Sequence, residues 1–205
     1  ASIPAKCFDN INGKKVLDLC AAPGGKTMQL ASMGADVTAL DISSKRLERV
    51  KQNLERTKLK ANCITADALQ WEPKQFFDAI LLDAPCSASG TIRRHPDLPF
   101  AKENFDLGDL LKLQRALLLK ASKWLAPGGV LIYSTCSIFS AEGEGQIQWL
   151  SKNNNILSPQ KIDPIPLGLN DYMANADGQI RLRPDYFSDE GGMDGFFVAK
   201  FTLKN

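Results

Sequence analysis

The stretch "LDLCAAPGGKT", residues 17–27, decides how the rest of this chain can fold. It has the pattern of a buried β-strand over residues 15–20, a turn of small residues, and the start of a helix at residue 25. Small residues let the backbone approach a ligand closely, and a helix N-terminus offers N–H donors together with the positive end of a dipole. The stretch therefore favours a ligand-binding strand–turn–helix unit over a tight turn that binds nothing.

Strands and helices alternate from this unit through the first two-thirds of the chain. Short apolar runs predict further strands at 36–41, 61–67, 77–83 and 130–135. Amphipathic segments predict helices at 25–34, 43–57, 110–129 and 141–153, and the third is expected to end at Pro127. Repeated strand-then-helix order favours an α/β fold with a mainly parallel central sheet and helices on both faces.

Two parts of the chain depart from this alternation. Residues 84–108 are rich in Pro, Ser and Gly, which predicts an irregular segment. After residue 155 the pattern loosens, and two late strands are predicted at 179–184 and 195–203, antiparallel to each other. The late part of the chain is therefore expected to add an antiparallel strand to the sheet.

Length and composition narrow the class of protein. A chain of 205 residues that is 44% hydrophobic and 23% charged suits a single globular α/β domain over residues 1–205. No apolar run approaches the roughly 18 residues of a membrane helix, and the first residues lack the pattern of a signal peptide. We therefore expect a cytoplasmic protein with no membrane partner. The formal net charge of +2 says little about other partners.

The cysteines argue against a disulfide framework and against a metal site. There are five of them at widely spaced positions with no CxxC pair, and the chain has a single histidine. Structural zinc sites and disulfide scaffolds need closely spaced or paired ligands. A reducing compartment and no bound metal are the expectation.

Polar or reactive side chains follow five of the predicted strands. In parallel sheets flanked by helices, ligands bind at the carboxyl ends of the strands, so these side chains are expected to meet at one rim. They are Asp18–Lys26, Asp41, Asp67, Asp83–Cys86 and Thr135–Cys136. The sequence therefore predicts an active site at that rim.

Two classes of ligand fit the turn after the first strand. A nucleoside triphosphate is suggested by Gly25-Lys26-Thr27, although Cys20 stands where the phosphate-binding loop of such proteins begins with glycine. S-adenosylmethionine is suggested by Asp18 and by Asp41, which lies 17 residues beyond the first glycine of the turn, where a carboxylate accepts hydrogen bonds from ribose hydroxyls. Nucleotide hydrolases need neither Asp41 nor Asp67, which favours S-adenosylmethionine.

The cysteines of "DAPC" (83–86) and "IYSTCS" (132–137) are expected to converge on one cleft, because neighbouring strands carry them. A thiol at a methyl-transfer site suits an unreactive ring carbon. Thiolate addition to carbon 6 of a pyrimidine turns carbon 5 into an enamine-like nucleophile. From these residues alone either Cys86 or Cys136 can be the attacking thiol, and a pair of packing cysteines is the plain alternative. Cys7 and Cys63 are interpreted as packing residues.

Four motifs occur in one order along nearly the whole chain: "LDLCAAPGGKT", "LLDAPCSASG" (81–90), "YSTCS" (133–137) and "GGMDGFF" (191–197). Together they resemble the Sun/Fmu family of RNA 5-methylcytosine methyltransferases, and within it the bacterial enzymes that act on small-subunit ribosomal RNA. The resemblance implies a Rossmann-like class I S-adenosylmethionine-dependent methyltransferase fold. It also implies methyl transfer to carbon 5 of a cytosine, with ribosomal RNA as the partner; a monomer is favoured.

The resemblance implies a role for each matching residue. Cys136 of the "TC" motif would be the nucleophile that forms the covalent adduct, and Cys86 of the "PC" motif would assist release of the product. Asp83 would lie between the methionine end of the cofactor and the target cytosine. Asp41 would hold the ribose and Asp67 the adenine end, and Arg46, one helical turn past Asp41, is expected to reach the cofactor. The turn would line the cofactor pocket with Cys20, Ala21, Ala22, Pro23, Gly24, Gly25 and Lys26, the last near the methionine carboxylate.

One departure from the family and two alternatives stand beside this interpretation. Members of the family usually carry a helical RNA-binding domain before the first strand. This chain begins about 15 residues before "VLDLC", so we expect that domain to be lacking. Arg93-Arg94-His95 are candidates for phosphate contacts, with a solvated loop as the equal alternative. The other functions to weigh are a P-loop nucleotide hydrolase and a catalytically silent RNA-binding module.

Overall fold

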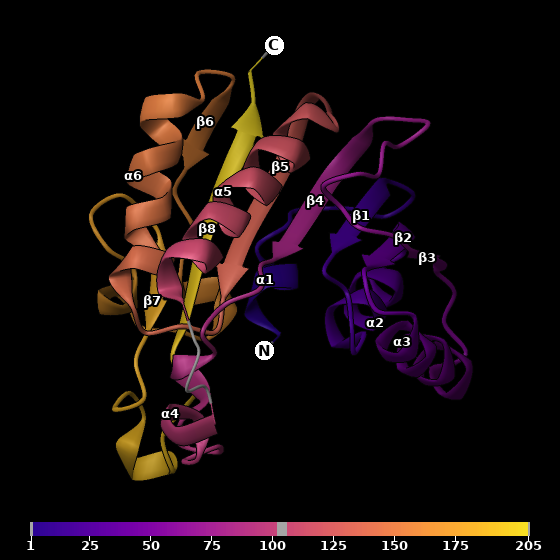
Figure 1. The fold of residues 1–205 in the computed structure, drawn as a ribbon. Helices are drawn as coiled ribbons and strands as arrows, with labels where there is room; N and C mark the ends of the chain where they lie inside the picture. Colours follow the sequence, from indigo (N-terminus) through magenta and orange to yellow (C-terminus); the bar gives the residue numbers. More distant parts are fainter. Residues whose placement is uncertain (1, 102–105, 205) are drawn as a thin grey trace.

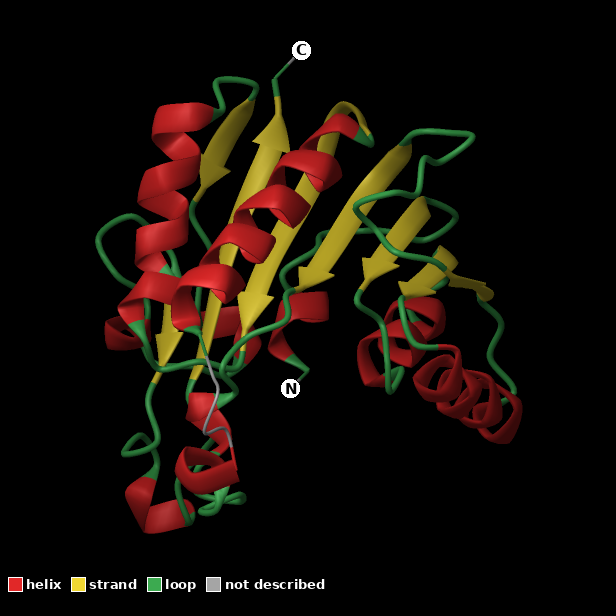
Figure 2. Ribbon diagram, viewed as in Figure 1, coloured by secondary structure: helices red, strands yellow, loops and turns green. Residues whose placement is uncertain are grey.

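An eight-stranded sheet organises the chain in the computed structural model, which describes residues 2–101 and 106–204. The strand order is β3-β2-β1-β4-β5-β8-β6, and β7 also pairs with β8 (Figures 1 and 2). Strands β1 to β5 are mutually parallel, whereas β8 is antiparallel to β5, β6 and β7. The strands are β1 (Lys15–Leu19), β2 (Asp36–Asp41), β3 (Asn62–Thr65), β4 (Phe77–Asp83), β5 (Leu125–Thr135), β6 (Leu157–Gln160), β7 (Ile180–Leu182) and β8 (Phe196–Leu203). This confirms the predicted mainly parallel sheet with antiparallel late strands.

Helices connect β1 to β2, β2 to β3 and β4 to β5, whereas β3 leads to β4 through a loop. The α-helices are α1 (Ile3–Lys6), α2 (Gly25–Ser32), α3 (Ser44–Thr57), α4 (Leu98–Ala101), α5 (Leu107–Lys123) and α6 (Glu144–Asn153). Short 3₁₀ helices are η1 (Ser89–Thr91), η2 (Ser140–Glu142), η3 (Ile165–Leu167), η4 (Asp171–Met173) and η5 (Ser188–Glu190). Within the two described ranges, no helix has both the length and the apolar character needed to cross a bilayer.

The two faces of the sheet are both covered. Helices α5 and α6 pack on one face, and α1 and α2 pack on the other (Figure 1). Alternate residues of β4 therefore enter different cores: Ile80 and Leu82 pack with α5, whereas Ala79 and Leu81 pack with the residues of α1. Burial on both faces explains why β4 reads as an unbroken apolar run instead of an alternating one.

The predicted helix over 110–129 is wrong at both ends. Helix α5 begins at Leu107, because the Asp106 carboxylate accepts hydrogen bonds from the first N–H groups of the helix. It ends at Lys123, before Pro127, because Trp124 is already bound to the sheet. The carbonyl of Trp124 accepts a hydrogen bond from Phe77 N at 2.8 Å, so "LAPGG" belongs to β5. Pairing with a neighbouring strand overrides the local helix pattern there.

Other boundaries differ less. The predicted strand at 61–67 is β3 over Asn62–Thr65, and the helix predicted at 141–153 is η2 followed by α6. Strand β6 was not predicted. It contains Pro159 and pairs only with β8, at the edge of the sheet where proline is tolerated. The segment predicted as irregular, 84–108, contains η1 and α4 and ends in α5, and its residues 102–105 lie outside the described ranges.

Candidate active site

The carboxyl ends of β1, β2, β4 and β5 meet at one edge of the sheet (Figure 2). The turn after β1 has its tightest point at Gly24, whose φ is +101° and whose N–H donates to Ala21 O at 2.8 Å. A Cβ at Gly24 would lie 2.9 Å from Val50 Cγ1 on α3. Glycine is therefore required by backbone conformation and by packing, and the turn is held against α3.

Asp41 and Arg46 hold the other side of this turn. The buried Asp41 carboxylate accepts hydrogen bonds from Ala22 N and Ser43 N, both at 3.0 Å. Arg46 donates to Ala22 O at 2.6 Å and lies 3.8 Å from Asp41. A cavity of about 110 Å³, which we call the Asp41 cavity, is lined mainly by apolar side chains together with Cys20, Asp41, Arg46 and Asp67. These four predicted residues are thus brought together.

A second cavity, of about 300 Å³, borders the turn itself. This turn cavity is lined by Ala21, Ala22, Pro23, Gly25, Lys26 and Asp83, among others. Lys26 Nζ lies 2.7 Å from Asp83 Oδ2, and Ser134 Oγ donates to Asp83 Oδ1 at 3.0 Å. Gly24 faces α3 and is not among the residues that line this cavity. Of the predicted cofactor residues, those from Ala21 to Lys26 other than Gly24 share this wall with Asp83.

These two cavities suit S-adenosylmethionine. The amino-acid end of S-adenosylmethionine carries both an ammonium and a carboxylate. The turn cavity offers the matching pair of charges in Asp83 and Lys26. The Asp41 cavity offers apolar walls for a base. The Asp41 oxygens each accept one N–H and retain lone pairs for sugar hydroxyls. The residues present therefore fit this cofactor.

Asp18 lies beneath the turn and is completely buried. Its Oδ2 accepts a hydrogen bond from Thr27 Oγ1 at 2.5 Å, whereas Oδ1 has no partner among the described residues. Burial raises the pKa of Asp18 to about 7, with smaller contributions from the nearby Asp83 and Asp41 carboxylates. Asp18 therefore exchanges its proton close to neutral pH in the folded protein.

Replacing Asp18 by asparagine is expected to stabilise the protein at pH 8 but much less at pH 5. The folded protein binds the Asp18 proton more tightly than the unfolded chain does, so stability falls as pH rises from about 4 to about 7. The asparagine side chain cannot ionise and avoids this loss, which amounts to a few kcal/mol at most. Urea unfolding at both pH values measures the difference. Asp36→Asn, at an exposed site, is the control, and a pH-independent effect of Asp18→Asn would contradict the assignment.

The two cysteines predicted to converge do so. Cys86 Sγ lies 3.3 Å from Cys136 Sγ, within hydrogen-bonding distance. Cys136 lines a third cavity of about 540 Å³, which we call the cysteine cavity, together with Lys26 and Asp83. Cys86 is not among the described residues that line it. The two sulfurs are therefore neighbours with different access to a ligand.

The hydrogen bond between the two thiols moves their pKa values in opposite directions. The hydrogen bond from Cys86 lowers the pKa of Cys136, against the opposing effect of burial. The same hydrogen bond, followed by burial, raises the pKa of Cys86. Burial raises the pKa of Cys7 and of Cys20 to about 12. Cys136 is thus the cysteine poised to be a thiolate, which is the reactive form of the side chain.

The "GGMDGFF" motif closes the cysteine cavity. Gly195 N donates to Gly90 O at 2.8 Å, and Gly90 N donates to Cys136 O at 2.9 Å. Asp194 accepts hydrogen bonds from Arg94 and lies 3.8 Å from Arg93. The two arginines that the sequence offers for phosphate contacts line the cysteine cavity, but their charges are partly matched by Asp194.

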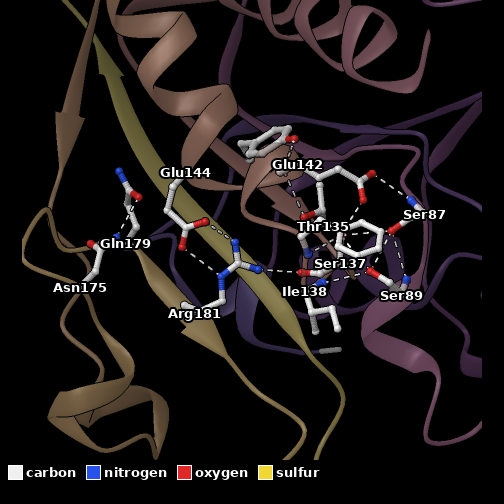
Figure 3. A network of polar contacts seen from close by, with 12 residues as sticks. Ser87, Ser89, Thr135, Ser137, Ile138, Glu142, Glu144, Asn175, Gln179 and Arg181 are labelled. Carbon is white, nitrogen blue, oxygen red and sulfur yellow. Dashed lines mark hydrogen bonds and ion pairs between the residues drawn. The ribbon is translucent and has the colours of Figure 1, made fainter. Parts of the chain in front are cut away.

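Sequence reasoning missed Glu142, a fully buried carboxylate between the two cysteine loops (Figure 3). It lies in η2, within the segment predicted as an amphipathic helix, where a glutamate is ordinarily solvent-exposed. The sequence pattern of an amphipathic helix gives no indication that one of its glutamates is buried.

Comparison with known proteins identifies the family to which this arrangement of residues belongs. Residues 5–202 match the family model for the 16S rRNA methyltransferase RsmB/F. The chain belongs to the RsmB/F family. This confirms the resemblance drawn from the four motifs and argues against a P-loop hydrolase. RsmB/F proteins and the related structures are S-adenosylmethionine-dependent methyltransferases.

One curated relative and two solved structures show how similar the chain is to known proteins. The chain is 48% identical over 199 residues to Ribosomal RNA small subunit methyltransferase B of Salmonella arizonae. The matched region covers 94% of this chain and 43% of that protein. The crystal structure of PH0851 superposes with a TM-score of 0.86 at 31% identity, covering 97% of this chain and 44% of that one. NSun6 from Pyrococcus horikoshii, solved with SFG, gives 0.80 at 28% identity, covering 99% and 51%. The chain spans less than half the length of this curated relative.

Proposed function

We propose that this chain transfers a methyl group from S-adenosylmethionine to carbon 5 of a cytosine in small-subunit ribosomal RNA, through a covalent adduct on Cys136. The observation that carries the proposal is the placement of Cys136 in the cysteine cavity, with Cys86 Sγ 3.3 Å from its sulfur and its pKa lowered by that hydrogen bond. The printed name of the curated relative supports ribosomal RNA as the substrate class. Residues 1–205 would form one catalytic domain, acting as a monomer.

The cofactor would bind across the turn after β1. Lys26 and Asp83 would hold its amino-acid end in the turn cavity, and Asp41, Arg46 and Asp67 would hold its adenosine end in the Asp41 cavity. When bound, S-adenosylmethionine supplies an electrophilic methyl group. Pro23, Lys26 and Asp83 line both the turn cavity and the cysteine cavity. The methyl donor and the target base would meet at these shared residues.

Cys136 would act as a nucleophile toward the base. Carbon 5 of cytosine is a poor nucleophile, and addition of the Cys136 thiolate to carbon 6 moves an electron pair onto carbon 5. Asp83 would lie against nitrogen 3 of the ring. After carbon 5 takes the methyl group, loss of its proton to a base lets the bond between carbon 6 and Cys136 break.

Cys86 would act when the adduct is released. Its thiol keeps its proton in the resting site and lies 3.3 Å from the sulfur that must leave carbon 6. A hydrogen bond from Cys86 to the departing sulfur would stabilise the thiolate that forms. The same contact that favours the attacking thiolate thus favours its departure.

The proposal is tested by incubating the chain with methyl-labelled S-adenosylmethionine and unmodified small-subunit ribosomal RNA. Digestion of the RNA and mass spectrometry of its nucleosides should find the label in 5-methylcytidine. Label in another nucleoside would overturn the proposed reaction. Absence of label despite cofactor binding by isothermal titration, with RNA bound, would favour the catalytically silent RNA-binding module.

A further inference from the structure

The sheet brings the sulfurs of Cys86 and Cys136 into contact. Asp83, at the end of β4, pairs with Ser134 of β5, and Ala84 N donates to Ser134 O at 2.9 Å. The two chain segments therefore leave the sheet side by side, and the two sulfurs lie 3.3 Å apart as free thiols. A disulfide bond is about 2.05 Å long, so the sulfurs need to approach by only about 1.3 Å to be joined.

Hydrogen bonds beyond the two cysteines keep their loops together. Glu142 accepts one from the backbone N–H of Ser87 at 2.9 Å and one from the hydroxyl of Ser137 at 2.6 Å (Figure 3). Ser87 and Ser137 each directly follow one of the cysteines, so a single side chain joins both loops. Gly90 N also donates to Cys136 O at 2.9 Å. These contacts hold the two thiols next to each other in the folded protein.

The other three cysteines have no such arrangement. Cys7 is buried, and its thiol donates to the carbonyl of Ile3 at 3.3 Å. Cys20 and Cys63 are half-buried, and in the described part of the chain neither sulfur lies within hydrogen-bonding distance of another sulfur. In proteins of a reducing compartment, an accessible thiol beside a second thiol is typical of a redox-sensing site.

We propose that Cys136 is a site of oxidation by peroxides and that Cys86 is its resolving thiol, so that oxidation closes the pair into a reversible disulfide. Cys136 lines the cysteine cavity, whose volume of about 540 Å³ admits a molecule as small as hydrogen peroxide. Cys86 is not among the described residues that line this cavity. Hydrogen peroxide in the cavity therefore meets the sulfur of Cys136 first.

The oxidation takes two steps with hydrogen peroxide as the oxidant. The thiolate of Cys136 attacks one peroxide oxygen, the O–O bond breaks, and the hydroxide that leaves takes up a proton to become water. Cys136 is then a sulfenic acid. The sulfur of Cys86 gives up its proton and attacks the sulfur of Cys136, and the S–O bond breaks as the hydroxyl group leaves as water. Two thiols are oxidised, one peroxide is reduced, and two water molecules form.

The closeness of Cys86 decides how far the oxidation of Cys136 proceeds. A sulfenic acid either condenses with a thiol or is oxidised further to a sulfinic acid, which is not readily reversed. A thiol at contact distance reacts as a neighbour within the same molecule, so condensation is the faster outcome. The hydrogen bond from Cys86 also lowers the pKa of Cys136, which favours the first step. The disulfide would remove both thiols of the proposed methyl transfer, and this consequence alone rests on the proposed function.

The test is peptide mapping of the wild-type chain after treatment with a small excess of hydrogen peroxide. Free thiols are then blocked with N-ethylmaleimide, and the chain is digested without reductant and analysed by mass spectrometry. A peptide pair joined through Cys86 and Cys136, two hydrogen atoms lighter than its parts, should appear. The number of free thiols should fall by two, from five to three, and dithiothreitol should restore all five.

Two variants sharpen the test. In Cys86→Ser the resolving thiol is missing, so Cys136 should gain two oxygen atoms as a sulfinic acid that dithiothreitol does not reverse. Cys63→Ser, the matched control, should form the same joined peptides as wild type. Sulfinic acid on wild-type Cys136 without a joined peptide, disulfides only between chains, or loss of the joined peptide in Cys63→Ser would overturn the proposal. Because this measurement needs neither RNA nor cofactor, failure of methyl transfer would count against the proposed function alone.

Discussion

Cys136→Ala is expected to lower methyl transfer to RNA by about 1,000-fold or more and to abolish covalent capture of RNA. Without the thiolate in the cysteine cavity, carbon 5 of the target base cannot become nucleophilic. Cys86→Ala should behave differently, because the attacking sulfur is still present. Its covalent RNA adduct should accumulate, since the group that assists departure of the Cys136 sulfur is missing.

Cys86→Ala has two opposing effects on the amount of covalent RNA adduct, and a time course separates them. Loss of the Cys86 hydrogen bond raises the pKa of Cys136, which slows attack at neutral pH. Loss of the same group slows release, so adduct still builds up over time. A time course with labelled RNA on a denaturing gel should therefore show slow but persistent capture.

Cys63→Ala is the control for these two variants. It changes a cysteine in β3, remote from the cysteine pair, and should keep wild-type methyl transfer. Capture of RNA by Cys136→Ala, with none by Cys86→Ala, would reverse the roles of the two thiols. The attacking sulfur would then be that of Cys86, which is not among the described residues that line the cysteine cavity.

Much of this site could be predicted from the sequence because the ends of the strands can be located from their apolar runs. Apolar runs mark β1, β2, β4 and β5, and the parallel topology brings the residues that follow them to one edge. The pattern of strands alone therefore predicts that Lys26, Asp83, Cys86 and Cys136 lie together. The prediction succeeds because the position of each residue depends mainly on the strand that carries it.

Features that depend on the path of loops could not be predicted. Which of two adjacent thiols lines a cavity depends on the paths of the loops that carry them, and the hydrogen bonds of Gly90 to Cys136 and Gly195 join these loops. Glu142 lies in a segment whose pattern is that of a solvent-exposed helix, yet η2 turns its side chain into the core. Helix α5 ends early because of Trp124, whose partner Phe77 lies far away in sequence.

Gly90→Ala is expected to destabilise the protein by about 3 kcal/mol and to impair methyl transfer even in the folded fraction. A Cβ at Gly90 would overlap the backbone carbonyl of Gly195 and would lie 2.9 Å from Cys136 O. Both obstacles are backbone atoms, so no side-chain rotation can relieve them. The structure must separate the "PC" loop from β8 and from the "TC" loop.

Separation of these loops links the loss of stability to the loss of activity. Gly90 N donates to Cys136 O and Gly90 O accepts from Gly195 N, so both hydrogen bonds weaken when the backbones move apart. The same movement lengthens the 3.3 Å contact between Cys86 Sγ and Cys136 Sγ, which removes the donor that lowers the pKa of Cys136. Urea unfolding measures the first effect, and the rate of Cys136 alkylation at pH 7.5 measures the second. Gly25→Ala is the matched control for stability, because a Cβ there meets no atom within 4 Å. Equal stability of the two variants would mean that the junction of Gly90, Gly195 and Cys136 can yield, and that the spacing of the two thiols does not depend on it.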